Sequence, residues 1–69
     1  MMLTKGMTAE EMTAMVDAMG WEIVDDEEYE AYDGSMARSV TVWQDDHAVA
    51  VEVFHGVVDS LEYVPAWAL

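Results

Sequence analysis

The side chains of this sequence with the most evident capacity for chemistry are carboxylates. Six of them fall within nine consecutive positions. The segment is DDEEYEAYD, residues 25–33, which also holds two tyrosines and which we call the acidic run. Carboxylates can act as paired acids and bases, as oxygen ligands of a metal ion, or as a negative field that attracts cations. Each of these chemistries makes a different demand on spacing.

Acid–base catalysis by two carboxylates requires a cleft that moves their pKa values apart, and 69 residues rarely build one. The chain has no cysteine, no G-x-S-x-G motif and no phosphate-binding loop. His47 and His55 fall at opposite ends of one expected strand, about 26 Å apart, which is too far to share a metal ion or a proton. We therefore expect no enzymatic activity and no cofactor.

A calcium loop of the EF-hand type requires glycine at its sixth position and a glutamate at its twelfth. Counted from Asp25, these positions are Glu30 and Met36, so the pattern fails. So many carboxylates will still associate weakly with cations. We expect no defined metal site, and a weak calcium-binding module remains a third candidate function.

The remaining chemistry is a surface that binds a cationic partner. Alternate residues of an extended segment point the same way at about 6.6–6.8 Å, so the acidic run would present rows of anions much as a phosphate backbone does. Two tyrosines would add aromatic contact of the kind enriched at interfaces. The predicted partner-binding residues are those of the acidic run and of one later turn: Asp25, Asp26, Glu27, Glu28, Tyr29, Glu30, Tyr32, Asp33, Asp45 and Asp46.

The charge of the whole chain points to the same class of partner. Fifteen acids face two bases, Lys5 and Arg38, which gives a net charge of −13, and no base lies within or beside the acidic run. Such a charge excludes direct binding to nucleic acid or to an anionic membrane. It favours a basic nucleic-acid-binding protein as the partner.

Two plainer explanations of the acidity stay open. A run of charge is often only a solvated loop, and the proteins of a salt-adapted organism are acid-rich throughout. The alternative function is then a non-enzymatic structural or regulatory module of an acid-rich proteome. Clustering within residues 25–33 favours a site, because salt-adapted proteins spread their acids over all surfaces.

Hydrophobic periodicity predicts the elements that must position these carboxylates. Thr8 and Glu11 have the spacing of a capping box at the start of a helix over residues 8–19. Its apolar stripe consists of Met12, Met15, Val16 and Met19. Four strands are expected at 21–24, 38–44, 47–54 and 57–64, with residues 25–36 as an acidic loop. The predicted fold is α+β: a single domain over residues 1–69 with one N-terminal helix on one face of a three- or four-stranded antiparallel sheet.

Two-residue turns would pair residue 44 with 47 and residue 54 with 57. One face of the sheet then seats the helix with its valines: Val40, Val42, Val49, Val51, Val53, Val58 and Val64. The same pairing sets Glu52 opposite Asp59, an unfavourable pair of like charges. The other face would carry a partly apolar patch. Either the acidic loop or the C-terminal segment PAWAL folds over it, or it forms a homodimer with Trp43, Phe54, Leu61 and Tyr63 as its anchors.

The N-terminal segment MMLTKGMTAEE lacks the apolar core of a signal peptide, and no apolar stretch approaches membrane-spanning length. We therefore expect a cytoplasmic protein.

This profile resembles the small acidic proteins by which bacteriophages and mobile elements block host defence, among them anti-CRISPR proteins and other DNA mimics. The resemblance rests on the size of the whole chain, its charge of −13, the segments DDEEYEAYD and QDDH, and the plan of one helix with a sheet. These proteins share no signature sequence, so the resemblance assigns no individual residue. It implies an inhibitor in the host cytoplasm that binds the positively charged channel of a CRISPR effector in competition with target DNA.

Overall fold

A computed structural model describes residues 2–68 as one α-helix, four strands and a short 3-10 helix. Their order is α1 (Ala9–Met19), β1 (Glu22–Glu30), β2 (Met36–Gln44), β3 (His47–Phe54), β4 (Val57–Pro65) and η1 (Ala66–Ala68). The strands form one antiparallel sheet in the order β1-β2-β3-β4. The predicted α+β class and order of elements are confirmed, with four strands in the sheet.

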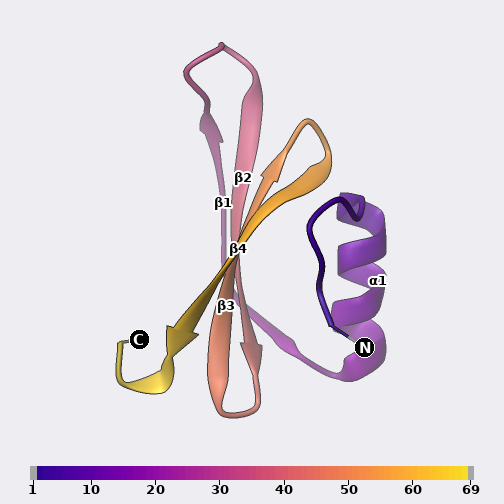
Figure 1. The fold of residues 1–69 in the computed structure, drawn as a ribbon, viewed down its shortest axis with the longest axis vertical. Helices are drawn as coiled ribbons and strands as arrows, with labels where there is room; N and C mark the ends of the chain where they lie inside the picture. Colours follow the sequence, from indigo (N-terminus) through magenta and orange to yellow (C-terminus); the bar gives the residue numbers. More distant parts are fainter. Residues whose placement is uncertain (1, 69) are drawn as a thin grey trace.

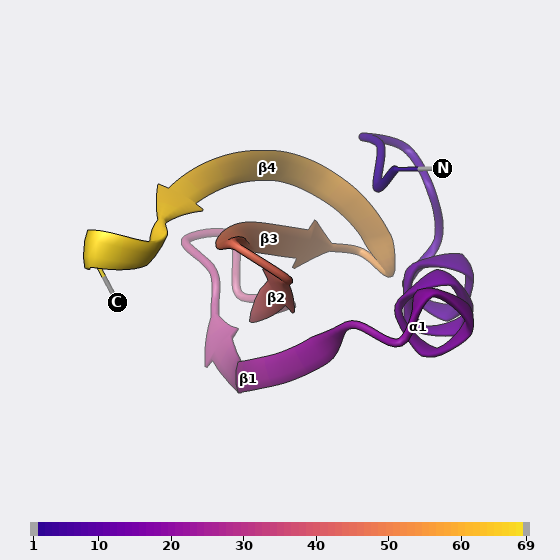
Figure 2. The same cartoon turned by 90° about the horizontal axis from the view of Figure 1, so that it is seen from below.

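The α-helix runs along one face of the sheet, and no α-helix among residues 2–68 covers the opposite face (Figures 1 and 2). Figure 2 shows the strands stacked from β1 to β4 with α1 to one side. We call the side toward α1 the helix face and the other side the open face. Because antiparallel partners project to the same side, the strand pairing assigns each residue to one face.

Local interactions at both ends define α1. The hydroxyl oxygen of Thr8 accepts a hydrogen bond from the Glu11 amide at 3.1 Å, and the Glu11 carboxylate accepts one from the Thr8 amide at 2.9 Å. Gly20 ends the helix in the left-handed region, at φ 71°, where glycine has no steric penalty. The amide of Trp21 then donates to the carbonyl of Val16 at 3.1 Å. The predicted capping box and glycine end are confirmed.

The core lies between α1 and the helix face. Its buried members come from the N-terminal segment, one stripe of α1 and the three later strands: Leu3, Met12, Val16, Val40, Val42, Val51, Val53 and Val58. The buried stripe of α1 is narrower than predicted. Met15 is partly buried, and Met19 in the last turn is 43% exposed.

The segment before α1 covers part of one edge of the sheet. The amide of Gly6 donates to the Val58 carbonyl at 2.9 Å, and the amide of Val58 donates to the Met7 carbonyl at 2.8 Å. Thr8 forms an isolated bridge with Val57. The start of β4 therefore has backbone partners on both sides, and Leu3 is brought into the core.

Residues 25–30 of the acidic run belong to a strand, which corrects the prediction of a loop over residues 25–36. β1 continues to Glu30, and the connection to β2 is only residues 31–35. Asp and Glu have low β-propensity, which hides the strand in the sequence. An edge strand can accept them because its side chains stay in water, and every residue of β1 is exposed.

A bulge in the last hairpin changes the predicted register. Both turns pair as expected, Gln44 with His47 and Phe54 with Val57. The pairing then shifts, so that Glu52 lies opposite Ser60 and Asp59 is the extra residue. The predicted like-charge pair of Glu52 and Asp59 is therefore wrong, because a bulged residue has no direct partner.

The shift also moves the later residues of β4 to the other side of the sheet. Leu61 pairs with the buried Val51, so it lies on the helix face, and Tyr63 follows it there. Val64 lies on the open face beside Ala48, although it was expected among the core valines. One inserted residue is enough, since the side-chain period of a strand is two.

Candidate acidic interface

β1, on the outer edge of the sheet, holds six carboxylates: Glu22 and the five of the acidic run at residues 25–28 and 30. The pleat divides them into two rows. Asp26 pairs with the buried Val40, which places Asp26, Glu28 and Glu30 on the helix face. Asp25, Glu27 and Tyr29 point to the open face. At about 3.3 Å per residue, both sides of the edge carry regularly spaced negative charge.

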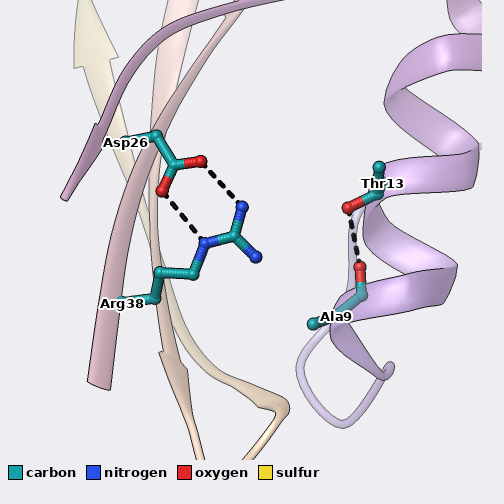
Figure 3. Close-up of polar contacts among 4 residues, drawn as sticks. All are labelled: Ala9, Thr13, Asp26 and Arg38. Atoms are coloured by element: carbon teal, nitrogen blue, oxygen red, sulfur yellow. Dashed lines mark hydrogen bonds and ion pairs between the residues drawn. The ribbon is translucent and has the colours of Figure 1, made fainter. Parts of the chain in front are cut away.

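A base does lie beside the acidic run, contrary to the sequence-based expectation. Arg38 on β2 donates two hydrogen bonds to Asp26, from Nε at 3.0 Å and from Nη2 at 2.7 Å (Figure 3). This pairing lowers the pKa of the Asp26 carboxyl and raises the pKa of Arg38. The two residues are twelve positions apart, and only the pairing of β1 with β2 makes them neighbours.

The arginine pair is not shielded by the helix. A hollow of about 510 Å³ is lined by Arg38 and by residues of α1 that include Ala9 and Thr13. The Thr13 hydroxyl donates to the Ala9 carbonyl of its own helix at 2.9 Å, as Figure 3 shows. The pair therefore stays partly solvated, and it neutralises only one carboxylate of the run.

The loop at residues 31–35 is built around Asp33. Asp33 Oδ1 accepts hydrogen bonds from the Ser35 amide at 3.0 Å and from the Ser35 hydroxyl at 2.6 Å, and these bonds lower the pKa of Asp33. Its Oδ2 lies 3.6 Å from Nε2 of His55 in the turn between β3 and β4. Asp33 thus orders the loop internally and lies beside that turn, while neighbouring Tyr32 is 100% exposed.

Asp45 and Asp46 lie at the opposite end of the sheet from that loop, at the turn between β2 and β3 (Figure 1). Asp46 Oδ1 is 2.6 Å from Nδ1 of His47, and this contact lowers the pKa of Asp46. Glu22, the first residue of β1, pairs with Trp43 two positions before Asp45. The predicted acidic residues therefore do not form one cluster. Five of them lie along the β1 edge, whereas Asp45 and Asp46 lie in the turn between β2 and β3 at one end of the sheet.

Tyr29 crosses the open face. It pairs with Ala37, and its hydroxyl donates to Oε2 of Glu52 on β3 at 2.7 Å. The small side chains of β2 on this face, Ala37 and Ser39, leave room for the ring. The hydrogen bond to the carboxylate raises the pKa of Tyr29 above its usual value of 10.0. The predicted partner-binding residues do not include Glu52, although a lone acid within the strand segment HAVAVEVF was a signal for it.

The four residues predicted as a dimer face do not share one face. Trp43 and Phe54 lie on the open face, but near opposite ends of the strands, beside Ala48 and Ala37 respectively. Leu61 and Tyr63 are on the helix face, where the Tyr63 ring lies 5.0 Å from the ring of His47. The bulge at Asp59 is the reason for the split. The C-terminal turn does not bury Trp67, which is 88% exposed.

Within residues 2–68, no three His, Asp or Glu side chains come together in a way that could hold a metal ion. No helix in the same range is long and apolar enough to cross a membrane. Comparison with protein-family models, curated proteins and solved structures finds no match to this chain.

Proposed function

We propose that this protein is an inhibitor that acts by binding, and that it presents the acidic edge along β1 to a basic nucleic-acid-binding protein. A CRISPR effector is the partner class suggested by the resemblance to anti-CRISPR proteins and DNA mimics, and the cytoplasm is the corresponding location. The observation that carries the proposal is that residues 25–30 of the acidic run form part of an exposed edge strand.

The spacing of charge along β1 supports a DNA-like role. A strand advances about 3.3 Å per residue, and one strand of B-DNA carries one phosphate per about 3.4 Å of helix axis. Residues 25–28 place a carboxylate at each successive step. A protein groove lined with Lys and Arg would therefore meet a similar linear density of negative charge over this part of the edge.

The order of the strand also favours binding. A disordered acidic loop would lose conformational entropy when it docks, whereas a formed strand has already lost it. None of the ion pairs among the described residues uses Asp25, Glu27, Glu28 or Glu30. These four carboxylates are therefore the ones we expect to contact the partner, with Asp26 contributing less because of Arg38.

A salt-adapted structural or regulatory module is the second candidate. The observation in its favour is that exposed acids also occur outside β1, at Glu10 and Asp17 of α1 and at Glu62 of β4. If this second candidate is correct, the acids maintain hydration and solubility, and no region of the surface is a dedicated binding site.

The test is a binding experiment with a matched pair of triple variants. The edge variant is Asp25→Asn, Glu27→Gln and Glu30→Gln. The control variant is Glu10→Gln, Asp17→Asn and Glu62→Gln. Each changes the net charge from −13 to −10. Tagged proteins are incubated with a bacterial lysate containing a CRISPR effector, at about 50 mM and about 500 mM NaCl, a range over which phosphate-like contacts weaken strongly.

We expect the parent and the control variant to retain a basic nucleic-acid-binding protein at low salt, to release it at high salt and to lose it to competing duplex DNA. The edge variant should retain much less of it. Equal retention by the two triple variants would show that only total charge matters. If no basic protein is retained by the parent at either salt concentration, the inhibitor proposal is wrong.

A further inference from the structure

The open face carries a hollow of about 350 Å³ at the end where β1 meets the loop of residues 31–35. This volume falls at the lower end of the range for small-ligand pockets. Three aromatic rings and two carboxylates from separate elements line it, and we call these residues the tyrosine pocket: Tyr29, Tyr32, Phe54, Glu52 and Asp59.

The strand register brings these residues together. Tyr29 on β1, Ala37 on β2 and Phe54 on β3 are successive partners, so two rings flank a small, buried alanine. In the next row, Glu52 lies on the same face, and the bulge places Asp59 nearby on β4. Both carboxylates act on the Tyr29 hydroxyl and raise its pKa, which is consistent with their position around one space.

The loop supplies the remaining wall. Asp33 accepts two hydrogen bonds from Ser35 within the loop, and its Oδ2 lies 3.6 Å from His55 in the turn that follows Phe54, so the loop lies beside that turn. Tyr32 projects next to this contact and is completely exposed. An aromatic side chain held in water beside a hollow has apolar area available for a ligand.

We propose that the tyrosine pocket binds the guanidinium group of an arginine side chain presented by a protein partner. Aromatic faces attract cations, and a guanidinium also stacks on them because it is planar. Its forked N–H groups match carboxylate oxygens, as Arg38 already does with Asp26 in this protein. Lysine has a compact ammonium that can use the charge but cannot stack in the same way.

This inference deepens the proposed function, and the identity of the partner rests on that proposed function. The affinity of the pocket for a guanidinium group does not depend on the proposed function. A DNA-like edge would attract basic groups without distinguishing among them, whereas the tyrosine pocket would favour arginine at one position. It would thus add specificity to a surface that otherwise contributes charge.

The test uses amide NMR spectra of the isotope-labelled full chain, titrated with N-acetyl-arginine methylamide. The matching citrulline compound is the neutral probe of similar shape, and the matching lysine compound carries the same charge. We expect the arginine probe to shift resonances of the pocket residues, chiefly Tyr32, Phe54 and Asp59. The citrulline probe should leave them unchanged, and the lysine probe should bind at least about threefold more weakly.

Two variants are matched in charge and chemistry. Glu52→Gln removes a pocket carboxylate, whereas Glu62→Gln removes a carboxylate of the same face that lies outside the pocket. We expect the first to weaken arginine binding about fivefold and the second less than about twofold. Asp59→Asn, which leaves the hydrogen bond between Tyr29 and Glu52 in place, should also weaken binding and guards against a folding defect in the first variant.

The pocket assignment is overturned if the shifts spread evenly over all exposed carboxylates, if the citrulline or lysine probe binds as well as arginine, or if the two Glu→Gln variants lose affinity equally. This result is separable from failure of the proposed function. Localised arginine binding without retention of a basic protein would leave the pocket standing and remove the inhibitor role. Retention of a basic protein with no localised shift would support the inhibitor role and overturn the pocket assignment.

Discussion

The pair of Asp26 and Arg38 shows how individual residues of this acidic strand are used. Arg38 is one of only two bases in the chain, and its position opposite β1 lets it bind one carboxylate in a bidentate arrangement. Both side chains are about one-third exposed, so water screens much of their attraction. The pair therefore helps to align the edge strand with β2 but contributes only modestly to stability.

A double-mutant cycle with Asp26→Asn and Arg38→Gln should give a coupling free energy of about 0.5–1 kcal/mol, measured by urea unfolding near neutral pH. Glu28→Gln is the control, because Glu28 pairs with Arg38 in the register but makes no hydrogen bond to it among the described residues. A coupling between Glu28 and Arg38 as large as that of Asp26 would mean that Arg38 senses only the general field of β1.

The pair of Asp26 and Arg38 should also make the stability of the protein depend on pH. The pKa of Asp26 is lowered in the folded state from 3.8, so its charged form is stabilised by folding. That contribution is fully present above the unfolded pKa and is lost as the pH falls through the lower folded pKa. The stability difference between the parent and Asp26→Asn should therefore be constant near neutral pH and shrink as the pH falls below 3.8. A difference that persists in acid would show that packing, and not charge, is its cause.

At the scale of elements, α1 is attached to the sheet through few residues. Met12 is completely buried, whereas Met19, in the same helix and of the same type, is 43% exposed. A domain of this size is expected to have a total stability of only about 3–10 kcal/mol. A single buried side chain can therefore decide whether the helix stays on the sheet.

We predict that Met12→Ala lowers the free energy of unfolding by about 2–4 kcal/mol, because it removes a buried side chain and leaves a cavity. Met19→Ala is the matched control and should cost less than about 1 kcal/mol. Circular dichroism during urea unfolding measures both. Equal losses would mean that Met12 does not anchor α1 in solution.

β1 is the element on which the proposed function depends, and its order can be measured without a partner. In a hydrogen-exchange experiment, the amides of β1 that donate hydrogen bonds to β2 should exchange slowly. The outward-facing amides of β1 and those at the tip of the loop should exchange quickly. The protected amides of β2 and β3, which have neighbours on both sides, should exchange most slowly. If residues 25–30 all exchange at the rate of an unfolded peptide, the strand forms only on binding.

At the scale of the whole molecule, net charge opposes folding. A charge of −13 on 69 residues repels itself, and two exposed rows of that charge lie along one edge. Repulsion of this kind also protects an open edge strand from pairing with a second copy. The acidity of β1 thus has a structural consequence, whatever partner it meets.

We predict that the protein is folded at low salt and that its melting temperature rises by several degrees between about 10 and 300 mM NaCl as the Debye length shortens. The edge variant with three neutralised carboxylates should melt higher than the parent at low salt and respond less to added salt. A parent that unfolds below molar salt would favour the salt-adapted module. A melting temperature unaffected by salt would show that self-repulsion is small.

The class of fold and the character of the surface were predictable from the sequence because they depend on local signals. Thr8, Glu11 and Gly20 define the helix through bonds to nearby backbone, and alternating valines define β2 and β3. The negative sign of the surface charge follows from composition alone, since the chain has 15 acids and two bases.

The tertiary structure decided what local signals could not. A row of Asp and Glu has no intrinsic preference for a strand, so only pairing with β2 made β1 a strand and brought Arg38 to Asp26. One bulged residue, Asp59, changed the face of every later side chain of β4, and thereby divided the predicted dimer face and formed the tyrosine pocket. Register is a long-range property, because the energy of a strand pair depends on which partner residues it brings together.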